Sequence, residues 1–223
     1  MIKKLLRRYC TWKHARSQQR NIFKEGTLLN AFYKSKTVFI HIPKTAGVSL
    51  LKAIYGDVTL EGHRSFYFNS IALNIKNEEY FSFTFVRNPW DRLYSSYKFL
   101  EKGGVNIHDK NAYEMYLSQY KSFEDFVING LDKKIIYKIT HFIPQSEFMC
   151  NNKGVVLVDY VGRFERLNQD IITLSKQLKK KVIMEHHNFN LKQDYTNIYT
   201  DGMIEKVRNI YKKDIDIFNY NFK

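Results

Sequence analysis

The chain is poor in the residues that build loop-rich and cross-linked folds. Its 223 residues include only 2 cysteines, 3 prolines and 10 glycines. Two cysteines as far apart as Cys10 and Cys150 exclude a disulfide framework and a four-cysteine zinc site, and they favour a reducing compartment. Few loop-forming residues, together with 44% hydrophobic and 16% aromatic residues, exclude a disordered chain. We therefore expect one α/β domain with a hydrophobic core.

Acidic residues are scarce relative to basic ones. Lysine and arginine number 36 against 22 aspartates and glutamates, which gives a formal charge of +14. An anionic partner is expected, and nucleic acid, membrane phosphate, an acidic glycan and a phosphorylated nucleotide all satisfy that sign. Long apolar runs are also lacking, so neither a signal peptide nor a membrane span is predicted. The protein is expected to be soluble or peripherally membrane-bound.

A basic N-terminal segment, residues 1–36, precedes the expected single domain of residues 37–223. The apolar residues interleaved with its cations are Leu5, Leu6, Tyr9 and Trp12. At helical spacing these residues fit a helix lying on an anionic bilayer, and they equally fit a helix packed on the domain. We favour the packed helix, because a few apolar positions make only a marginal membrane anchor.

The first strand–loop–helix unit lies at "TVFIHIPKTAGVSLLKAIY". The β-branched run 37–42 predicts a buried strand, and 48–55 predicts a helix. The tight turn between them points several backbone N–H groups at one place, which is a typical anion site. Lys44 stands at the entrance of this turn and adds a mobile positive charge.

A second unit repeats this arrangement. Residues 80–86, "YFSFTFV", predict a strand, and 89–101, "PWDRLYSSYKFLE", predict a helix with Asn88 as N-cap and Pro89 at its first position. Helical spacing directs a stripe of this helix into the core. The residues of that stripe are Leu93, Tyr97 and Leu100.

The rest of the chain predicts further elements in the same alternation. Residues 108–121 show no clear period and suggest an inserted binding surface, whereas 122–130 predict a short helix. Residues 155–165 predict a third strand and 166–180 a helix. Thr200 is expected to cap one C-terminal helix carrying the apolar residues Ile204, Val207, Tyr211, Ile215 and Phe218. Alternating strands and helices predict a mainly parallel sheet flanked by helices.

Two motifs resemble those of the sulfotransferase family. "FIHIPKTAGVSL" is similar to the family's phosphosulfate loop, and "FTFVRNPWDRLYSSYKF" to its motif for the 3′-phosphate of 3′-phosphoadenosine 5′-phosphosulfate (PAPS). The resemblance continues through "GHRSF" and "DYVGRFERLNQD" to residue 222. It is closest to the carbohydrate-modifying branch with the uronosyl 2-O-sulfotransferases and compact bacterial members. It implies a P-loop-like three-layer fold and a PAPS-dependent carbohydrate O-sulfotransferase.

The resemblance implies a set of donor-binding residues. The matching positions are Lys44, Thr45, Ala46, Gly47, Val48, Ser49, Arg87, Ser95, Gly162 and Arg163. Val48 departs from the threonine or serine common in the family, which leaves backbone donors to carry that contact. Arg87 offers a planar fork suited to bidentate phosphate binding. Two separated anion sites suit a donor that carries both a 3′-phosphate and a 5′-phosphosulfate.

The chemistry needs few groups. An acceptor hydroxyl attacks sulfur in line and the bridging oxygen leaves with 3′,5′-adenosine bisphosphate, so Lys44 is expected to stabilise charge on that oxygen. His63 is the expected general base, because it matches the second histidine of the "HGH" element in the uronosyl enzymes. Glu61 replaces the first histidine and would orient His63 or play no catalytic part. A sulfuryl group carries less charge than a phosphoryl group, so no metal is expected.

The acceptor is expected to be a saccharide, and the residues expected to face it are Glu61, Arg64, Lys98, His141 and Gln145. Abundant lysine, asparagine and isoleucine suggest an AT-rich bacterial genome, so we expect a cell-surface or capsular glycan, acidic or lipid-linked, sulfated in the cytoplasm before export. Peripheral contact with anionic membrane through the N-terminus stays open. Two alternatives also stay open: a nucleotide-dependent kinase of related fold, and a basic nucleic-acid or membrane-surface binding module. No nucleic-acid reader motif is evident, so nucleic acid is not expected as a partner.

Overall fold

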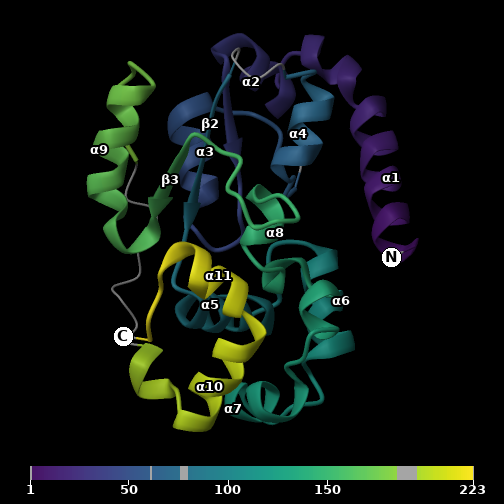
Figure 1. The fold of residues 1–223 in the computed structure, drawn as a ribbon, viewed down its shortest axis with the longest axis vertical. Helices are drawn as coiled ribbons and strands as arrows, with labels where there is room; N and C mark the ends of the chain where they lie inside the picture. The colour runs from purple at the N-terminus through teal and green to yellow at the C-terminus, as the bar shows by residue number, and fades with distance from the viewer. Residues whose placement is uncertain (1, 61, 76–79, 185–194, 223) are drawn as a thin grey trace. The chain divides into compact units, whose positions relative to one another are not determined.

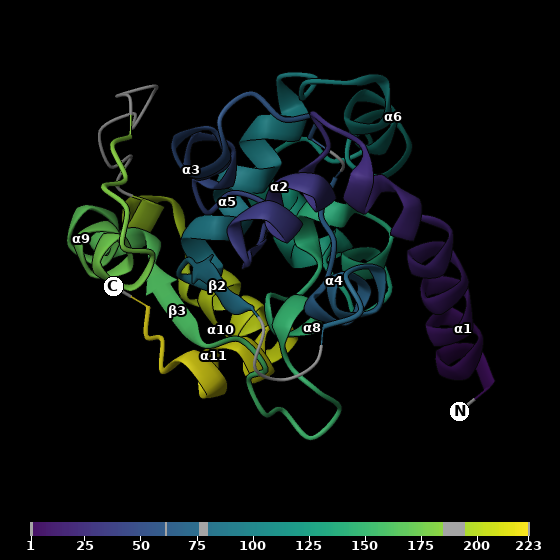
Figure 2. The same ribbon diagram turned by 90° about the horizontal axis from the view of Figure 1, so that it is seen from above.

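The computed structural model (Figures 1 and 2) describes residues 2–60, 62–75, 80–184 and 195–222, with side chains from residue 10 onward. The chain divides into two compact units. The first unit comprises 1–42, 46–86 and 147–187, and the second comprises 43–45, 87–146 and 188–223. The division into an N-terminal segment of residues 1–36 and a single domain of residues 37–223 stays a prediction. Among the described residues, no helix is both long and apolar enough to cross a membrane.

The first unit is built on a three-stranded parallel sheet. Its strands are β1 (Thr37–Ile40), β2 (Phe81–Val86) and β3 (Tyr160–Arg163), in the order β1-β2-β3. In register, Phe39 lies beside Phe83 and Phe85 beside Gly162. Strands β1 and β2 are largely buried, as expected of parallel strands covered by helices, whereas only Gly162 is buried in β3. The predicted α/β class with a parallel sheet flanked by helices is confirmed.

The third strand is shorter than the predicted 155–165. Residues before it turn back on the preceding segment, where the N–H of Leu157 donates to the carbonyl of Met149 at 2.9 Å. Pairing with β2 begins at Asp159, whose carboxylate accepts from both the N–H and the hydroxyl of Ser82, at 2.7 and 2.6 Å. The apolar run therefore divides between a turn and a strand, which periodicity alone does not separate.

Helices surround this sheet within the first unit. They are α1 (Ile2–Ser17), η1 (Gln19–Phe23), α2 (Leu28–Ser35), α3 (Gly47–Tyr55), α4 (Phe66–Ala72), η5 (Phe164–Arg166) and α9 (Leu167–Gln177). Figures 1 and 2 show α9 beside β3 and α1 beside α4. His14 of α1 meets Phe68 of α4 edge to face at 5.2 Å, which agrees with the packed N-terminal helix. The side chains of Leu5, Leu6 and Tyr9 lie outside the described residues, and membrane contact stays a prediction.

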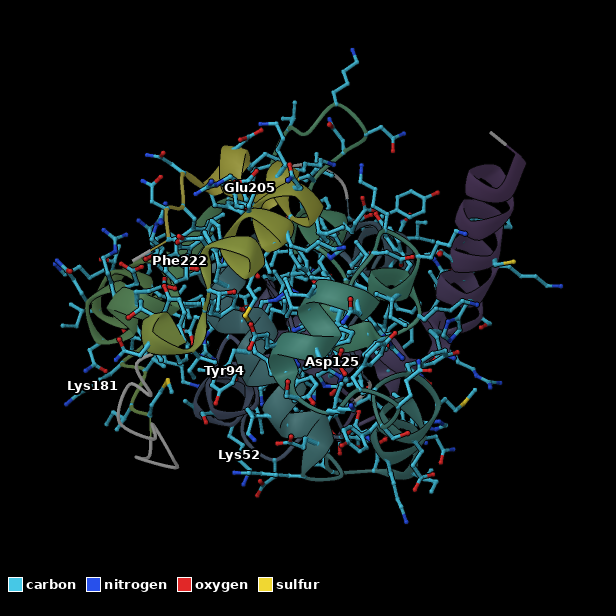
Figure 3. The ribbon with its side chains drawn as sticks, turned by 90° about the horizontal axis from the view of Figure 1, so that it is seen from below. Lys52, Tyr94, Asp125, Lys181, Glu205 and Phe222 are labelled. Atoms are coloured by element: carbon cyan, nitrogen blue, oxygen red, sulfur yellow. The ribbon has the colours of Figure 1, made fainter. Side chains whose placement is uncertain are left out.

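The second unit is helical and has an aromatic core. Its helices are α5 (Pro89–Glu101), α6 (Ile107–Tyr116), α7 (Phe123–Asp125), η2 (Phe126–Gly130), η3 (Ile135–Tyr137), η4 (Thr140–Phe142), η6 (Tyr195–Ile198), α10 (Asp201–Ile210) and α11 (Lys212–Phe218). A short helix α8 (Ser146–Met149) crosses the boundary between the units. Trp90 of α5 packs edge to face on Phe222, which is labelled in Figure 3, at 5.7 Å. The predicted core stripe of α5 is buried as expected.

Helix α5 begins where the sequence predicts. The side chain of Asn88 accepts a hydrogen bond from the N–H of Trp90 at 3.1 Å, and Pro89 occupies the first helical position. The helix predicted at 48–55 is also confirmed, as α3. The helix predicted at 166–180 is observed as α9, with Leu167, Ile171 and Leu174 buried.

One helix was not predicted, and one prediction about the helices is wrong. Residues 108–121 contain the helix α6, capped by the side chain of Asn106, which accepts from the N–H of Asp109. Because Asp109 is the one residue of α6 that is buried, the helix shows no apolar stripe to find. The expected single C-terminal helix is two helices, α10 and α11, which break at the buried Tyr211. Thr200 stands at the N-cap of α10 without a side-chain capping bond.

Candidate active site

The turn after β1 has a constrained backbone. Lys44 and Ala46 both have positive φ, 69° and 65°, a region in which residues other than glycine store strain. Thr45 between them is fully buried. Turns that combine left-handed residues with a helix start gather N–H groups into a concavity for an anion. The backbone thus supports the anion site predicted for this turn.

The start of α3 requires a glycine. A Cβ on Gly47 would lie 1.8 Å from Cδ2 of His41, so the imidazole occupies the space that any side chain would need. Ala46 is the N-cap, and the first N–H groups of a helix have no partner within it. Val48 is 47% exposed and Ser49 is partly buried, so both sit at the accessible helix start.

The side chain of Lys44 rests in the second unit. Its ammonium lies 4.1 Å from the ring centroid of Phe99 on α5. Burial first, and then the positive charge of Arg87, lower the pKa of Lys44 to about 8, although the carboxylate of Asp109 acts in the opposite direction. A lysine with a pKa near neutrality is typical of functional sites.

Arg87, directly after β2, is held by hydrogen bonds along both edges of its guanidinium. Its Nε and one terminal nitrogen donate to both oxygens of Asp91, at 2.7 and 2.8 Å. The other terminal nitrogen donates to the carbonyl of Lys44 at 3.0 Å and to the hydroxyl of Ser95 at 3.1 Å. The predicted arginine and serine therefore lie together, and the same guanidinium reaches the lysine turn.

The side chain of Gln145 bonds the main chain of Arg87. Its side-chain oxygen accepts from the N–H of Arg87 at 2.9 Å, and its side-chain nitrogen donates to the Arg87 carbonyl at 2.8 Å. The residue is fully buried. Its own N–H donates to Asp214 at 2.6 Å. The expected contact of Gln145 with the acceptor is therefore corrected: both ends of its amide are already bonded to the main chain of Arg87.

His63 lies in the first unit, against the strand that leads to the turn. Its Nδ1 is 3.0 Å from the carbonyl oxygen of His41, and the two rings are 4.3 Å apart at 59°. A carbonyl only accepts, so this bond places the proton on Nδ1 and leaves the lone pair of a neutral ring on Nε2. That is the tautomer a general base at Nε2 needs. Glu61 lies outside the described residues, so its expected part beside His63 stays a prediction.

Gly162 and Arg163 end β3 and have clear structural roles. A Cβ on Gly162 would lie 2.4 Å from the ring of Phe85 on the neighbouring strand. The N–H of Arg163 donates to the buried carboxylate of Asp170 at 2.6 Å. Their predicted contacts with the donor stay predictions.

Three expected acceptor contacts lie in defined settings. Arg64 stacks over Phe68 at 4.5 Å in the first unit. Lys98 pairs with Glu101 on the surface of α5. The ring of His141 lies beside Phe99 at 5.0 Å, and its Nδ1 is 3.7 Å from Asp109. His141 is thus the one of these three that joins the surroundings of Lys44.

The structure sorts the predicted site residues between the two units. The first unit contains Ala46, Gly47, Val48, Ser49, His63, Arg64, Gly162 and Arg163. The second contains Lys44, Thr45, Arg87, Ser95, Lys98, His141 and Gln145. Sequence reasoning missed Asp91, Phe99 and Asp109. The i,i+4 spacing of Asp91 after Arg87 was a usable signal, whereas nothing local connects Phe99 or Asp109 to Lys44.

Metal ligation has no evident place in the described part of the chain. No group of three or more histidine, cysteine, aspartate or glutamate side chains is arranged there to hold an ion. The expectation of a metal-free reaction stays a prediction.

Many α/β proteins bind anionic ligands where the strands of a parallel sheet end. This chain has a parallel sheet, with a basic turn after its first strand and an arginine after its second. The chain belongs to the sulfotransferase family, whose model matches residues 31–221. It is therefore an enzyme of a family that transfers sulfuryl groups and typically uses PAPS as donor.

A further similarity is to a curated protein. A protein of Archaeoglobus fulgidus described as uncharacterized is 30% identical over 99 residues, which are 44% of this chain and 68% of that protein. No solved structure matches the chain. The family itself therefore rests on the match over most of the chain, and the acceptor is open to proposal.

Proposed function

We propose that this protein transfers the sulfuryl group of PAPS to a hydroxyl of a saccharide. The observation that carries the proposal is the joining of Lys44 and Arg87 through one hydrogen bond, within a chain of the sulfotransferase family. A lysine turn and a neighbouring arginine supply two cationic groups, which suits a donor with a phosphosulfate and a separate phosphate. The acceptor we propose is a bacterial cell-surface or capsular glycan, modified in the cytoplasm, since a charge of +14 favours an acidic saccharide.

The proposed reaction is an in-line displacement at sulfur. The oxygen of the acceptor hydroxyl forms a bond to sulfur, its proton passes to Nε2 of His63, and the bridging oxygen leaves with 3′,5′-adenosine bisphosphate. Lys44 stabilises the charge that grows on that oxygen. Backbone N–H groups from Thr45 to Ser49 bind the phosphosulfate, and Arg87 with Ser95 binds the 3′-phosphate. These roles follow from the resemblance together with the local geometry of each residue.

Nucleotide binding tests the donor. Calorimetry with 3′,5′-adenosine bisphosphate should show tight binding that needs no magnesium, because the protein supplies the positive charge itself. Adenosine triphosphate with magnesium is the comparison, and generic DNA at low salt is a second one. Tight binding of the triphosphate without the bisphosphate would favour a kinase, and salt-dependent DNA binding alone would favour a binding module. Either result would overturn the proposed function.

Lys44→Ala tests the stabilisation of the leaving oxygen. Removing one group that stabilises transition-state charge lowers kcat by about 10²- to 10³-fold. Turnover is measured with labelled PAPS on polysaccharide extracts from cells that lack the gene, and sulfate gain is read by mass spectrometry. Lys52→Ala is the matched control, because Lys52 is an exposed lysine of α3. A rate near that of the unaltered protein for Lys44→Ala would remove Lys44 from the mechanism.

His63→Ala tests the base. A histidine that must be neutral to accept a proton produces an acidic limb in the pH profile of kcat/KM, which the substitution should abolish together with about 10²-fold or more of the rate. His63→Gln keeps a hydrogen-bonding side chain and should fail equally. An unchanged acidic limb in a folded variant would place the base elsewhere.

A further inference from the structure

The ammonium of Lys44 has a defined resting place. It lies over the face of Phe99, 4.1 Å from the ring centroid, where the negative face of the ring attracts a cation. Phe99 is only partly buried, so the ring is not simply a core residue. The stripe that enters the core from this helix runs instead through Leu93, Tyr97 and Leu100. The position of Phe99 therefore calls for another explanation.

A second side chain fixes the ring of Phe99. The imidazole of His141 lies 5.0 Å from it at 42°. The carbonyl of His141 accepts hydrogen bonds from Arg92 at 3.2 Å and from Ser96 at 3.1 Å, and both of these donors are buried on α5. Because α5 holds the main chain of His141 and also carries Phe99, the two rings keep a constant spacing.

Asp109 completes the arrangement from α6. One carboxylate oxygen lies 3.7 Å from Nδ1 of His141, while the other accepts from the N–H of Val105 at 3.1 Å. Gly104 makes room for this carboxylate, since a Cβ there would lie 2.1 Å from the Cβ of Asp109. The carboxylate is thus built into its place by the loop that precedes α6.

The charges around Lys44 are unequal. Arg87, which donates to the Lys44 carbonyl and is itself paired with Asp91, repels the ammonium, whereas Asp109 attracts it. Burial and the charge of Arg87 lower the pKa of Lys44 to about 8, so groups that attract the ammonium help to keep it charged. Among the described residues of the second unit, the ring face of Phe99 and the carboxylate of Asp109 support the charged form.

We propose that Phe99, held in place by His141 and Asp109, is a positioning residue that seats the Lys44 ammonium and keeps it charged for the leaving oxygen. This inference rests on the proposed function of Lys44. It assigns to the end of α5 a role in the sulfuryl-transfer step in addition to the contact of its start with Arg87. It also gives Asp109 a purpose that no local motif suggests.

Phe99→Leu tests whether the ring positions the Lys44 ammonium, because leucine is also apolar but has no aromatic face. We expect kcat to fall about tenfold, and the alkaline limb of kcat/KM to move to lower pH by about 0.5 to 1 unit. Affinity for 3′,5′-adenosine bisphosphate should stay within about twofold. Phe99→Tyr keeps the aromatic face, so its kcat and the pH of its alkaline limb should match those of the unaltered protein.

Two further variants separate positioning from stability. Phe123→Leu removes a buried aromatic ring of the same unit, and it should lower the melting temperature without moving the alkaline limb. Asp109→Asn removes the attracting charge, and it should move the limb in the same direction as Phe99→Leu. The inference would be overturned if folded Phe99→Leu kept the alkaline limb of kcat/KM at its original pH. It would also be overturned if the leucine and tyrosine variants had the same kcat and the same alkaline limb.

A direct titration keeps the inference testable if the donor assignment fails. NMR titration of lysine labelled at Cε, with Lys44→Arg used to assign the signal, reports the Lys44 pKa without any turnover. Phe99→Leu should lower that pKa and Phe99→Tyr should not. If the unaltered protein does not bind the bisphosphate, the proposed function fails but the positioning role of Phe99 does not. If the Lys44 pKa is unchanged in Phe99→Leu, the positioning role of Phe99 fails but the proposed function does not.

Discussion

Arg87 shows how one side chain serves two purposes at the residue scale. Its fork is expected to grip a phosphate, yet the structure shows both edges of the guanidinium bonded within the protein. At least four of its five N–H donors are committed, so a bidentate phosphate must displace at least one existing partner. Asp91 keeps the guanidinium oriented, and the bond to the Lys44 carbonyl supports a turn with positive φ.

Arg87→Ala is therefore expected to affect both binding and rate. Loss of charge-assisted bonds should weaken binding of 3′,5′-adenosine bisphosphate by about 10- to 100-fold. Loss of the bond to the Lys44 carbonyl should also lower kcat, because the turn that presents the ammonium loses its support. Calorimetry and saturating kinetics measure the two effects separately.

The control for Arg87 is an arginine of the same unit that pairs on the surface. Arg208 on α10 bonds Glu205, which Figure 3 labels, and Arg208→Ala should change neither quantity. Unchanged bisphosphate affinity in Arg87→Ala would remove Arg87 from the donor site. A lowered affinity with normal kcat would show that the bond to Lys44 has no part in turnover.

At the scale of elements, helix α5 serves the site through two of its stripes. Asp91 and Ser95 lie one turn apart and both bond Arg87. Arg92 and Ser96, one position further along, bond the carbonyl of His141. Spacing of three to four residues aligns side chains on one helix face, so a single helix positions two separate groups.

The start of α3 has no space for a side chain at Gly47. Gly47→Ala would place a methyl group 1.8 Å from Cδ2 of His41, so the imidazole must move. Overpacking of this kind lowers the free energy of unfolding by about 1 to 3 kcal/mol. The displaced ring also disturbs the contact with His63, so kcat should fall. Urea unfolding and kinetics check both effects.

Gly56→Ala is a comparison for the space at Gly47, because a Cβ at Gly56 meets no atom within 4 Å. Its cost is expected to come from the positive φ of 73° alone. Normal turnover in Gly56→Ala beside impaired turnover in Gly47→Ala would support the imidazole contact. Equal turnover in the two variants would contradict it.

At the scale of the whole molecule, the C-terminal helix α11 holds a segment almost 70 residues earlier. The two oxygens of Asp214 accept from the N–H groups of Gln145 and Ser146, at 2.6 and 2.9 Å. Burial raises the pKa of Asp214, and the charge of Arg92 together with these bonds opposes that rise. Gln145 in turn holds Arg87. The stability of this unit therefore depends on Asp214, and so does the support of Arg87, whose binding of the donor is proposed.

Asp214→Asn is expected to be severe. The amide replaces one acceptor oxygen by a donor that faces an N–H group, and the buried Arg92 loses its counter-charge. Breaking such a buried arrangement lowers the free energy of unfolding by about 3 to 5 kcal/mol. Asp216→Ala is the matched control on the same helix, because Asp216 pairs with Lys212 at the exposed surface. Equal urea midpoints for the two variants would contradict the role of Asp214.

Sequence alone was sufficient for β1 and β2, for α3 and α5 and for the pairing of Arg87 with Ser95, whereas the anion site at the turn stays a prediction. These features depend on local patterns: β-branched runs, a capping asparagine before a proline, and helical spacing. It failed at α6, whose single buried residue leaves no periodic signal, and at β3, where a turn consumes half of an apolar run.

Only the tertiary structure decided which side chains surround Lys44. Phe99, Asp109, His141 and Arg87 come from separate parts of the chain, and no local spacing predicts that they meet. The same holds for Gln145, whose amide bonds the Arg87 main chain and so does not face the acceptor. Local pattern determines which element a residue belongs to, whereas contacts between distant residues arise from how those elements pack, and at this site packing determined the charge and position of the lysine.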